Sequence, residues 1–528
     1  METRTPRKGM LAALRRKPVD RSPATPVLHL MFSTPHGGCT QWNETGLIVS
    51  TSDQRARYAS GESRNFSAWR GGIAILTAKT QRTQWLRFRL RLRPSPFTPF
   101  NFNERRTVMA KLAINGGEPM VKRALGKSWP IFDEKEEKAL FEVLRSGHWW
   151  RGGLEPSESK VSQFEDRFAF YSQAKHGIAI TNGTQALECA LKAAGVEAGD
   201  EVIVPALTFV ATATSVALVN AIPIFVDVDP ETYNISPQAI EDAITERTRA
   251  IIPVHNGGYP CDMDAISRIA KKHNLIVLED CAHAHGSEWK GKRCGSLGDL
   301  STFSFQQGKA LTCGEGGIVL TSDAELAEKA YSFMHIGRVP GRPFYEFHRV
   351  ASNLRMTEFQ AAVLLCQFER LDEQIETRER NTRHLSEGLQ EIEGIEPLVR
   401  DERVTRWSFY YWNFKYREEA FDGIPRDRFI EALKAEGVPI GVGAHGEPIY
   451  RNPLFQNMNF GRTGCPIKCP LYGKKIDYRE TFCPEAERIY EKEALSLPHA
   501  LFLGGKEDMD LILEAIRKVR ADTDELRK

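Results

Sequence analysis

A lysine at position 309 lies in a segment whose residue types suit covalent chemistry. Lys309 ends the sequence Ser304-Phe-Gln-Gln-Gly-Lys309, and the glycine-rich turn Gly314-Glu-Gly-Gly317 follows closely. Glycines let the backbone bend sharply, and an amine held beside such a bend can capture an aldehyde cofactor as a Schiff base. A lone lysine near glycines is usually a surface residue. The chemical interpretation therefore depends on the rest of the chain.

Three upstream segments carry complementary groups. The segment Asn182-Gly183-Thr184 lies between an expected strand and helix, where free amides and the helix dipole attract a phosphate. Phe209 follows the next strand and can stack on a planar ring. Asp280 ends an apolar strand, so its carboxylate needs a cationic partner such as a protonated pyridine nitrogen. Each group alone is also typical of a helix cap, a core side chain or a buried structural carboxylate. In this order, together with a lysine, they are what pyridoxal phosphate requires.

The elements that position these groups alternate along the chain. From residue 109 onward, short apolar strands alternate with helices of roughly 10 to 15 residues, which indicates a parallel sheet covered on both faces. A single long helix over residues 357–393 is expected to lead into a second domain. The sequence predicts an α/β large domain that binds the cofactor over residues 109–365, and a smaller α+β domain over residues 366–528. The expected strands are 177–181, 201–204, 222–227, 250–254, 275–279 and 408–414, and the other expected helices are 133–146, 184–194, 263–273, 426–436 and 508–520.

The first 108 residues differ from the rest in charge. They hold 19 Lys or Arg and 6 Asp or Glu, which leaves 52 of the 71 basic and 63 of the 69 acidic residues for the remainder. Only residues 86–93 show a strand-like alternation, so we expect a basic, disordered extension. A nucleic-acid-binding arm, an organelle transit segment and an over-extended start all fit such a segment. Met109, which resembles a natural start, favours the last.

Composition limits the compartment and the metal content. The 528 residues are 41% hydrophobic and 27% charged, as in soluble globular proteins. No apolar run approaches the roughly 20 residues that cross a bilayer, so we expect a cytoplasmic protein without a membrane partner. The ten cysteines suit reduced packing residues. Cys465, Cys469 and Cys483 have no evident fourth ligand, and we expect no metal.

Several motifs of the chain match a known family. From about Met109 to the C-terminus, the chain resembles the DegT/StrS family of pyridoxal-phosphate-dependent aminotransferases, which have the aspartate-aminotransferase fold, fold type I. The matching segments are Asn182–Leu187, Pro205–Phe209, Glu279-Asp280, Ala284–Gly286, Gly298-Asp299, Phe303–Phe305, Lys309, Gly314–Gly317 and Asn353–Arg355.

The resemblance implies a role for each matching residue. Lys309 would hold the cofactor covalently and act as the acid-base catalyst, and Asp280 would pair with the ring nitrogen. An Asn at the position of Asn353 reaches the phosphate in the partner subunit, which implies a homodimer with shared active sites. The other cofactor-binding residues would be Gly183, Thr184 and Ser304 at the phosphate, and Phe209 against the ring.

Two departures from the family bear on the substrate. His283 stands where most members have Gln, and its imidazole can still donate a hydrogen bond to the phenolic oxygen of the cofactor. Gln306-Gln307-Gly308 replaces the His-Pro type of segment that is common in nucleotide-sugar members. These features resemble the branch that aminates keto-inositols such as scyllo-inosose, with L-glutamine or glutamate as amino donor. Candidates for substrate contacts in the later loops are His445, Tyr450 and Tyr472.

Three alternatives remain open at this point. The acceptor can be a nucleotide-linked keto-sugar, or the lysine can serve dehydration and aromatisation of a cyclic amino acid. From a different class, a regulatory or nucleic-acid-binding protein can retain a relic of the cofactor fold and use the basic arm. The intact Lys309, Asp280 and phosphate anchor argue against a relic, so we expect no nucleic-acid partner.

Overall fold

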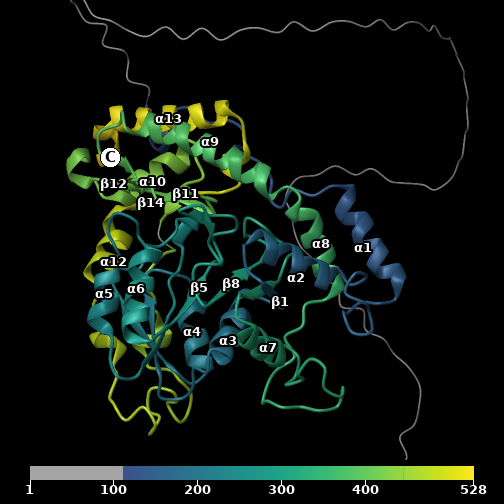
Figure 1. Ribbon diagram of the computed structural model, residues 1–528. Coiled ribbons are helices and arrows are strands. Elements are labelled where there is room, and N and C mark those ends of the chain that lie inside the picture. The colour runs from purple at the N-terminus through teal and green to yellow at the C-terminus, as the bar shows by residue number, and fades with distance from the viewer. Residues whose placement is uncertain (1–110, 444) are drawn as a thin grey trace, which may run out of the picture. The chain divides into compact units, whose positions relative to one another are not determined.

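A seven-stranded sheet forms the centre of the first part of the described chain (Figure 1). The computed structural model describes residues 111–443 and 445–528. The strand order is β1-β9-β8-β5-β4-β2-β3, and every neighbouring pair is parallel except the two pairs that involve β9. This confirms the mostly parallel sheet that the sequence predicts. The strands are β1 (His176–Ile180), β2 (Glu201–Pro205), β3 (Ile222–Val226), β4 (Thr248–Ile251), β5 (Ile276–Asp280), β8 (Leu300–Ser304) and β9 (Gly317–Thr321).

Helices cover this sheet and connect its strands, as parallel strands require. The helix that begins at the carboxyl end of β1 is α3, and the Asn182 side chain accepts a hydrogen bond from Gln185 N at its first turn. An amide oxygen at this position satisfies a backbone donor that the helix leaves free. The helices are α1 (Glu134–Ser146), α2 (Lys160–Tyr171), α3 (Gly183–Ala193), α4 (Ala211–Leu218), α5 (Pro237–Ala243), α6 (Met263–His273) and α7 (Ala324–Met334).

The predicted long helix over residues 357–393 is wrong as a single element. It is two helices, α8 (Glu358–Phe368) and α9 (Leu371–Leu389). The amides of Glu369 and Arg370 donate to carbonyls three residues earlier, which closes α8 with a tightened turn. The guanidinium of Arg370 is held by Glu136, at 2.5 Å, and by Asp133, at 2.7 Å. Apolar periodicity continues across the break, so the sequence gives no sign of it.

A second, antiparallel sheet follows α9 and carries the later part of the chain. Its strand order is β10-β12-β14-β13, and Figure 1 shows α9 alongside α13 next to this sheet. The strands are β10 (Ile395–Pro397), β12 (Tyr411–Tyr416), β13 (Gly441–Val442) and β14 (Ala494–Pro498), and the longer helices here are α10 (Arg426–Ala435) and α13 (Lys506–Ala521). A small third sheet joins β6 (Glu288–Trp289), β7 (Lys292–Arg293) and β11 (Val404–Arg406).

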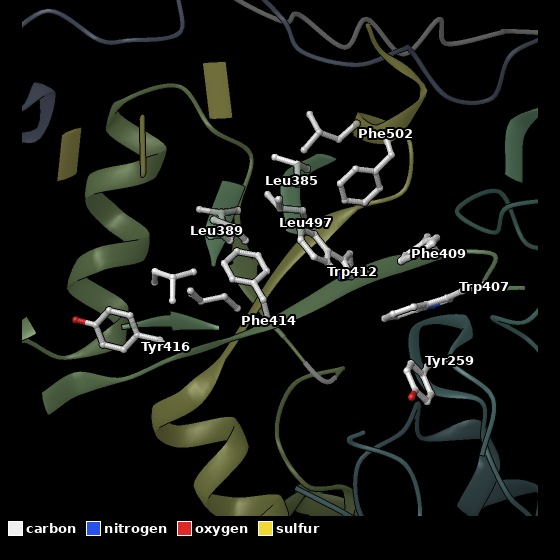
Figure 2. Packing of buried hydrophobic residues seen from close by; sticks show 14 of the residues in the cluster. Tyr259, Leu385, Leu389, Trp407, Phe409, Trp412, Phe414, Tyr416, Leu497 and Phe502 are labelled. Atoms are coloured by element: carbon white, nitrogen blue, oxygen red, sulfur yellow. The ribbon is translucent and has the colours of Figure 1, made fainter. Parts of the chain in front are cut away.

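Buried aromatic side chains hold strand β12 in the core of the second sheet. The first residues of this strand lie at the site described below. Trp412, Phe414 and Tyr416 alternate along β12 and are buried. Figure 2 shows them packed with Leu385 and Leu389 of α9. Alternate residues of a strand face the same side, so the burial of these three rings fixes how β12 is oriented. It thereby also fixes the position of Tyr410 and Tyr411, which precede them. Trp407 and Phe409 stack with ring centroids 4.2 Å apart just before them.

Two earlier expectations concern the N-terminal extension and membrane-spanning segments. The expectation of a disordered extension over residues 1–108, and of a strand-like alternation at 86–93, concerns residues outside the described ones. None of the helices in residues 111–443 and 445–528 combines the length and the apolar composition that a membrane span requires.

Candidate active site

The predicted chemical groups meet at one edge of the seven-stranded sheet. Asn182 follows β1, Thr208 follows β2, and Asp280 and Ser304 end β5 and β8. Because the carboxyl ends of parallel strands lie along the same edge, the turns that follow them form a common crevice. Lys309 lies five residues beyond β8, near enough to Asp280 for the two charges to influence each other.

The Lys309 amine is enclosed and easily deprotonated. Its Nζ lies 4.4 Å from the centre of the Tyr410 ring, at the start of β12. Burial lowers the pKa of Lys309 to about 8, and the Asp280 carboxylate opposes this shift. An amine that loses its proton near neutral pH is a nucleophile and a base, whereas an exposed lysine stays protonated. Tyr410 had no signal in the sequence, because it comes from the second sheet.

Asp280 is a buried carboxylate that neutral hydrogen-bond donors surround. Its side chain accepts hydrogen bonds from the Thr212 hydroxyl, at 2.9 Å, and from Ala282 N, at 3.1 Å. Burial raises the pKa of Asp280, and no ion pair in the described parts of the chain includes it. A cation at this carboxylate would reverse the pKa shift. The Asp280 carboxylate therefore fits the protonated ring nitrogen of the expected cofactor. Thr212 was missed, although it lies one helical turn after Thr208.

The first turn of α3 forms a cradle without side chains in the way. A Cβ added to Gly183 would lie 2.7 Å from Ser304 Cβ, and one added to Gly317 would lie 2.5 Å from the Asn182 carbonyl oxygen. These glycines allow β8, β9 and the start of α3 to approach closely. Free amides, the Thr184 hydroxyl and the Ser304 hydroxyl come from this same region, and this is the donor set that a phosphate needs.

His283 presents a ring nitrogen for which the structure provides no partner. The side chain is buried, and its ring stacks on Tyr410 with the centroids 4.3 Å apart. Nδ1 has no hydrogen-bond partner within residues 111–443 and 445–528. A buried polar atom without a partner fits a site that a ligand completes. Phe209 is 55% exposed, and its ring centre is 5.9 Å from that of His445.

The substrate candidates in the later loops separate into two groups. His445 lies in the site, with Nε2 3.0 Å from Nε2 of His283. The other two candidates are hydrogen-bonded elsewhere, because the Tyr450 hydroxyl donates to Glu487 and the Tyr472 hydroxyl donates to Glu201, and their role stays a prediction. Both rings are buried, and Glu201 begins β2, at the opposite end of this strand from the site.

Asn353 neighbours Leu354, whose carbonyl oxygen accepts a hydrogen bond from Thr181 N just before the first turn of α3. Asn353 is exposed and forms a bridge with His335, after helix α7. No contact with Lys309, Asp280 or Ser304 is recorded for it within the described chain. This position is compatible with the role that the resemblance implies for it, which involves a second subunit.

The Glu279 carboxylate, in β5, is the centre of a buried hydrogen-bonded network. His255, Glu279 and Cys294 are the one group in the described ranges that places three metal-binding atoms within 4.8 Å of one another. The Glu279 carboxylate is 3.0 Å from His255 Nε2, and its remaining capacity is taken by backbone amides. These amides belong to Gly295, Leu297 and Gly298. Within the described ranges Cys465, Cys469 and Cys483 do not form such a group, and the Cys483 amide donates to the Tyr450 hydroxyl.

Most of the described chain is similar to known proteins. Residues 130–517 match the DegT/DnrJ/EryC1/StrS aminotransferase family. A protein of Streptoalloteichus tenebrarius, provisionally named an L-glutamine:3-amino-2,3-dideoxy-scyllo-inosose aminotransferase, is 40% identical over 420 residues, which are 79% of this chain and 100% of the relative. The L-glutamine:2-deoxy-scyllo-inosose aminotransferase of Micromonospora echinospora is 38% identical over 434 residues, with 79% and 100% covered. The crystal structure of 3-amino-5-hydroxybenzoic acid synthase has a TM-score of 0.65 at 37% identity and covers 76% of this chain and 98% of its own.

Proposed function

The chain belongs to the DegT/DnrJ/EryC1/StrS aminotransferase family, and from this premise we propose its cofactor and its substrates. It is an aminotransferase with fold type I, as its motifs predict. We propose that it transfers an amino group from L-glutamine or L-glutamate to a keto-cyclitol such as scyllo-inosose, with pyridoxal 5'-phosphate as cofactor. The observation that carries the proposal is the enclosed Lys309 amine beside a buried carboxylate that has no ion-pair partner in the described chain.

The residues that would hold the cofactor come from four turns of one sheet edge. Gly183, Thr184 and Ser304 would bind its phosphate, and Phe209 would stack on its ring. Asp280 would keep the ring nitrogen protonated. When bound, pyridoxal phosphate would supply an aldehyde for the amine and a cationic ring that takes up electrons from the donor's α carbon.

Lys309 is the group that moves protons. In its neutral form, Nζ accepts a proton from the α carbon of the amino donor, and in its ammonium form it returns a proton during amination of the ketone. The Tyr410 ring, 4.4 Å from Nζ, stabilises the ammonium form by a cation–π interaction. Because the product of the amino donor leaves before the ketone is aminated, this two-stage cycle is expected to show ping-pong kinetics.

Neutral hydrogen-bonding groups near Lys309 suit a hydroxylated ring as acceptor. Burial and the charge of Lys309 hold the pKa of His283 well below its usual range and lower that of His445 to about 3, so both rings are neutral. The Tyr411 hydroxyl donates to Asn256 beside them. The names of two relatives, which include glutamine and a scyllo-inosose, support the same substrate class.

A second candidate function follows from the match to 3-amino-5-hydroxybenzoic acid synthase, which is 37% identical. In this case Lys309 would serve dehydration and aromatisation of a cyclic substrate. An assay panel separates the candidates: scyllo-inosose, 2-deoxy-scyllo-inosose and nucleotide-linked keto-sugars are each tested with L-glutamine, and the products are examined for aromatic absorbance. We expect an aminocyclitol product, and exclusive activity on a nucleotide-linked sugar would refute the proposed acceptor.

The covalent role of Lys309 has its own test. The purified protein is expected to be yellow, and borohydride should remove its visible band and attach the cofactor to a peptide that contains Lys309. Lys309→Ala should lower turnover by at least about a thousandfold, because anchor and base are both lost. Lys506→Ala, which removes an exposed lysine paired with Asp510, is the control and should keep full activity. Transamination by Lys309→Ala at the parent rate would contradict the proposal.

We also propose that two copies of the chain form a homodimer with shared sites. Support comes from the exposed position of Asn353 and from large apolar side chains at the surface. These include Phe141 and Leu144 of α1 and the loop residues Phe344 and Phe347, each about half exposed in the single chain. Exposed apolar side chains of this kind are typical of surfaces that bind another protein.

A further inference from the structure

His445 and His283 share a hydrogen bond although 162 positions separate them in the chain. Nε2 of one ring is 3.0 Å from Nε2 of the other, and the ring centres are 4.7 Å apart. One imidazole must therefore donate and the other accept. Since both rings are neutral, the bond allows two arrangements, which differ only in the tautomer of each ring.

The second nitrogen of His283 distinguishes the two arrangements. If His283 donates through Nε2, its buried Nδ1 carries a lone pair. If His283 accepts at Nε2, Nδ1 carries the proton and can donate. Rotation of the ring is hindered by Tyr410 and Tyr411, whose ring centres are 4.3 Å and 5.4 Å away. Nδ1 has no partner in the described residues, and an unpaired buried polar atom is unfavourable, so a ligand atom is expected there.

The backbone at His445 indicates that this side chain is held in place at a cost. Its φ is 70°, in the left-handed region, which residues other than glycine adopt uncommonly. Gly446 follows, also with a positive φ. Local strain of this kind persists where surrounding contacts require one side-chain position.

We propose that His445 is a positioning residue that donates Nε2–H to His283 and so keeps the His283 proton on Nδ1. The inference rests on the proposed function, because the acceptor of Nδ1–H is the phenolic oxygen of pyridoxal phosphate. That oxygen only accepts hydrogen bonds when it is deprotonated, and a lone pair on Nδ1 would repel it. A glutamine amide can donate this hydrogen bond by itself. A histidine at position 283 needs His445 to keep its proton on Nδ1.

Four variants of the same loop separate this role from packing. His445→Leu removes the donor, with His445→Met as a second variant should the first not fold. His445→Gln keeps an N–H that can reach Nε2. Glu447→Gln is the control, since Glu447 is exposed in the same loop and pairs with Arg451 at 3.5 Å. Thermal unfolding of the cofactor-free proteins checks that each variant is folded.

The first measurement uses cofactor-free protein with 15N-labelled histidine. The His283 signals are assigned from their loss in His283→Gln. We expect the proton on Nδ1 in the parent protein, in His445→Gln and in Glu447→Gln. In His445→Leu, we expect a substantial population with the proton on Nε2. A parent protein with the His283 proton on Nε2 would overturn the inference.

The second measurement titrates the visible absorption band of the loaded protein with pH. Loss of a donated hydrogen bond leaves the phenolic oxygen more negative. The proton that it shares with the nitrogen joined to Lys309 is therefore retained to higher pH. We expect the midpoint to rise by about one pH unit in His445→Leu and the affinity for pyridoxal phosphate to fall by about tenfold. The other titratable groups that face His283 are unchanged in all variants: Lys309, His285, His255, Tyr410 and Tyr411.

The outcomes distinguish this inference from the proposed function. Equal shifts in His445→Leu and His445→Gln would show a packing role and overturn the inference, as would no shift in His445→Leu. A parent protein that binds no pyridoxal phosphate would overturn the proposed function together with the acceptor named here. A parent protein that binds the cofactor, but whose His283 tautomer does not depend on His445, would overturn the inference alone.

Discussion

At the scale of single residues, the chemistry depends on the balance of charge between Lys309 and Asp280. Burial favours the neutral form of both, and each charge favours the other's charged form. The pair thus holds an amine that is partly unprotonated near neutral pH next to a carboxylate that is ready for a cation. Neither property belongs to an isolated lysine or aspartate in water.

This balance predicts how capture of the cofactor depends on pH. The Lys309 pKa is lowered from 10.5 to about 8, so the amine is protonated and unreactive below this value and gains reactivity as the pH rises through it. The rate at which cofactor-free protein captures pyridoxal phosphate should rise with a midpoint near pH 8. Nα-acetyl-lysine, measured in parallel by stopped flow, should show its midpoint more than two units higher.

Asp280→Asn tests the other half of the balance. The Asp280 carboxylate raises the pKa of Lys309, so its removal should move the midpoint to lower pH. Turnover should fall by roughly a thousandfold, because the protonated cofactor ring, which takes up electrons, would lose the carboxylate that stabilises its charge. A midpoint that stays in place or rises in Asp280→Asn would contradict the charge coupling, and unchanged turnover would contradict the catalytic role.

At the scale of elements, the phosphate cradle depends on how closely α3 approaches the end of β8. Gly183 begins α3, and its missing Cβ leaves room for Ser304. The two elements come from different parts of the chain, and only small residues at this junction permit the contact. The substitution of one glycine should therefore affect both binding and stability.

Gly183→Ala should lower the affinity for pyridoxal phosphate by about tenfold and the free energy of unfolding by about 1–3 kcal/mol, because the new Cβ would lie 2.7 Å from Ser304 Cβ. Cofactor titration and denaturant unfolding measure the two effects. Gly505→Ala is the matched control: Gly505 precedes α13 with φ −81°, and its Cβ would lie 4.0 Å from the nearest atom. If the two variants behave alike, close packing at Gly183 is not needed.

At the scale of the whole molecule, the proposed homodimer makes each site depend on two chains. Within the described part of its own chain Asn353 forms no hydrogen bond with Lys309, and the proposal assigns it to the phosphate in the partner's site. In this arrangement, a dimer of Lys309→Ala with Asn353→Ala has one site with both substitutions and one site with none.

Mixing the two variants tests this arrangement. Each alone should be nearly inactive. After joint refolding in equal amounts, about a quarter of the sites should be intact, so about a quarter of the parent activity should return. A mixture of Lys309→Ala with parent protein controls for recovery on refolding, because half of the parent activity should remain whether or not the subunits exchange. If sedimentation shows dimers but the mixture of the two variants stays inactive, the sites are not shared in this way.

The sequence alone determined which chemical groups are available and where the strands that carry them end. Asn182, Asp280, Ser304 and Lys309 could be placed because strand ends, helix caps and glycine turns are encoded by neighbouring residues. Parallel strands bring their carboxyl ends to one edge, so local signals were sufficient to predict that these groups meet. The mostly parallel sheet followed from the same alternation.

Only the tertiary structure decided what surrounds these groups. Tyr410 and His445 reach Lys309 from the second sheet and its loops, more than 100 residues away in the chain, and no local pattern encodes such contacts. The break between α8 and α9 depends on Arg370 meeting Glu136, which is also distant in sequence. The lowered pKa of Lys309 has the same origin, because it arises from desolvation, and desolvation depends on what packs over an atom rather than on the residues beside it in the chain.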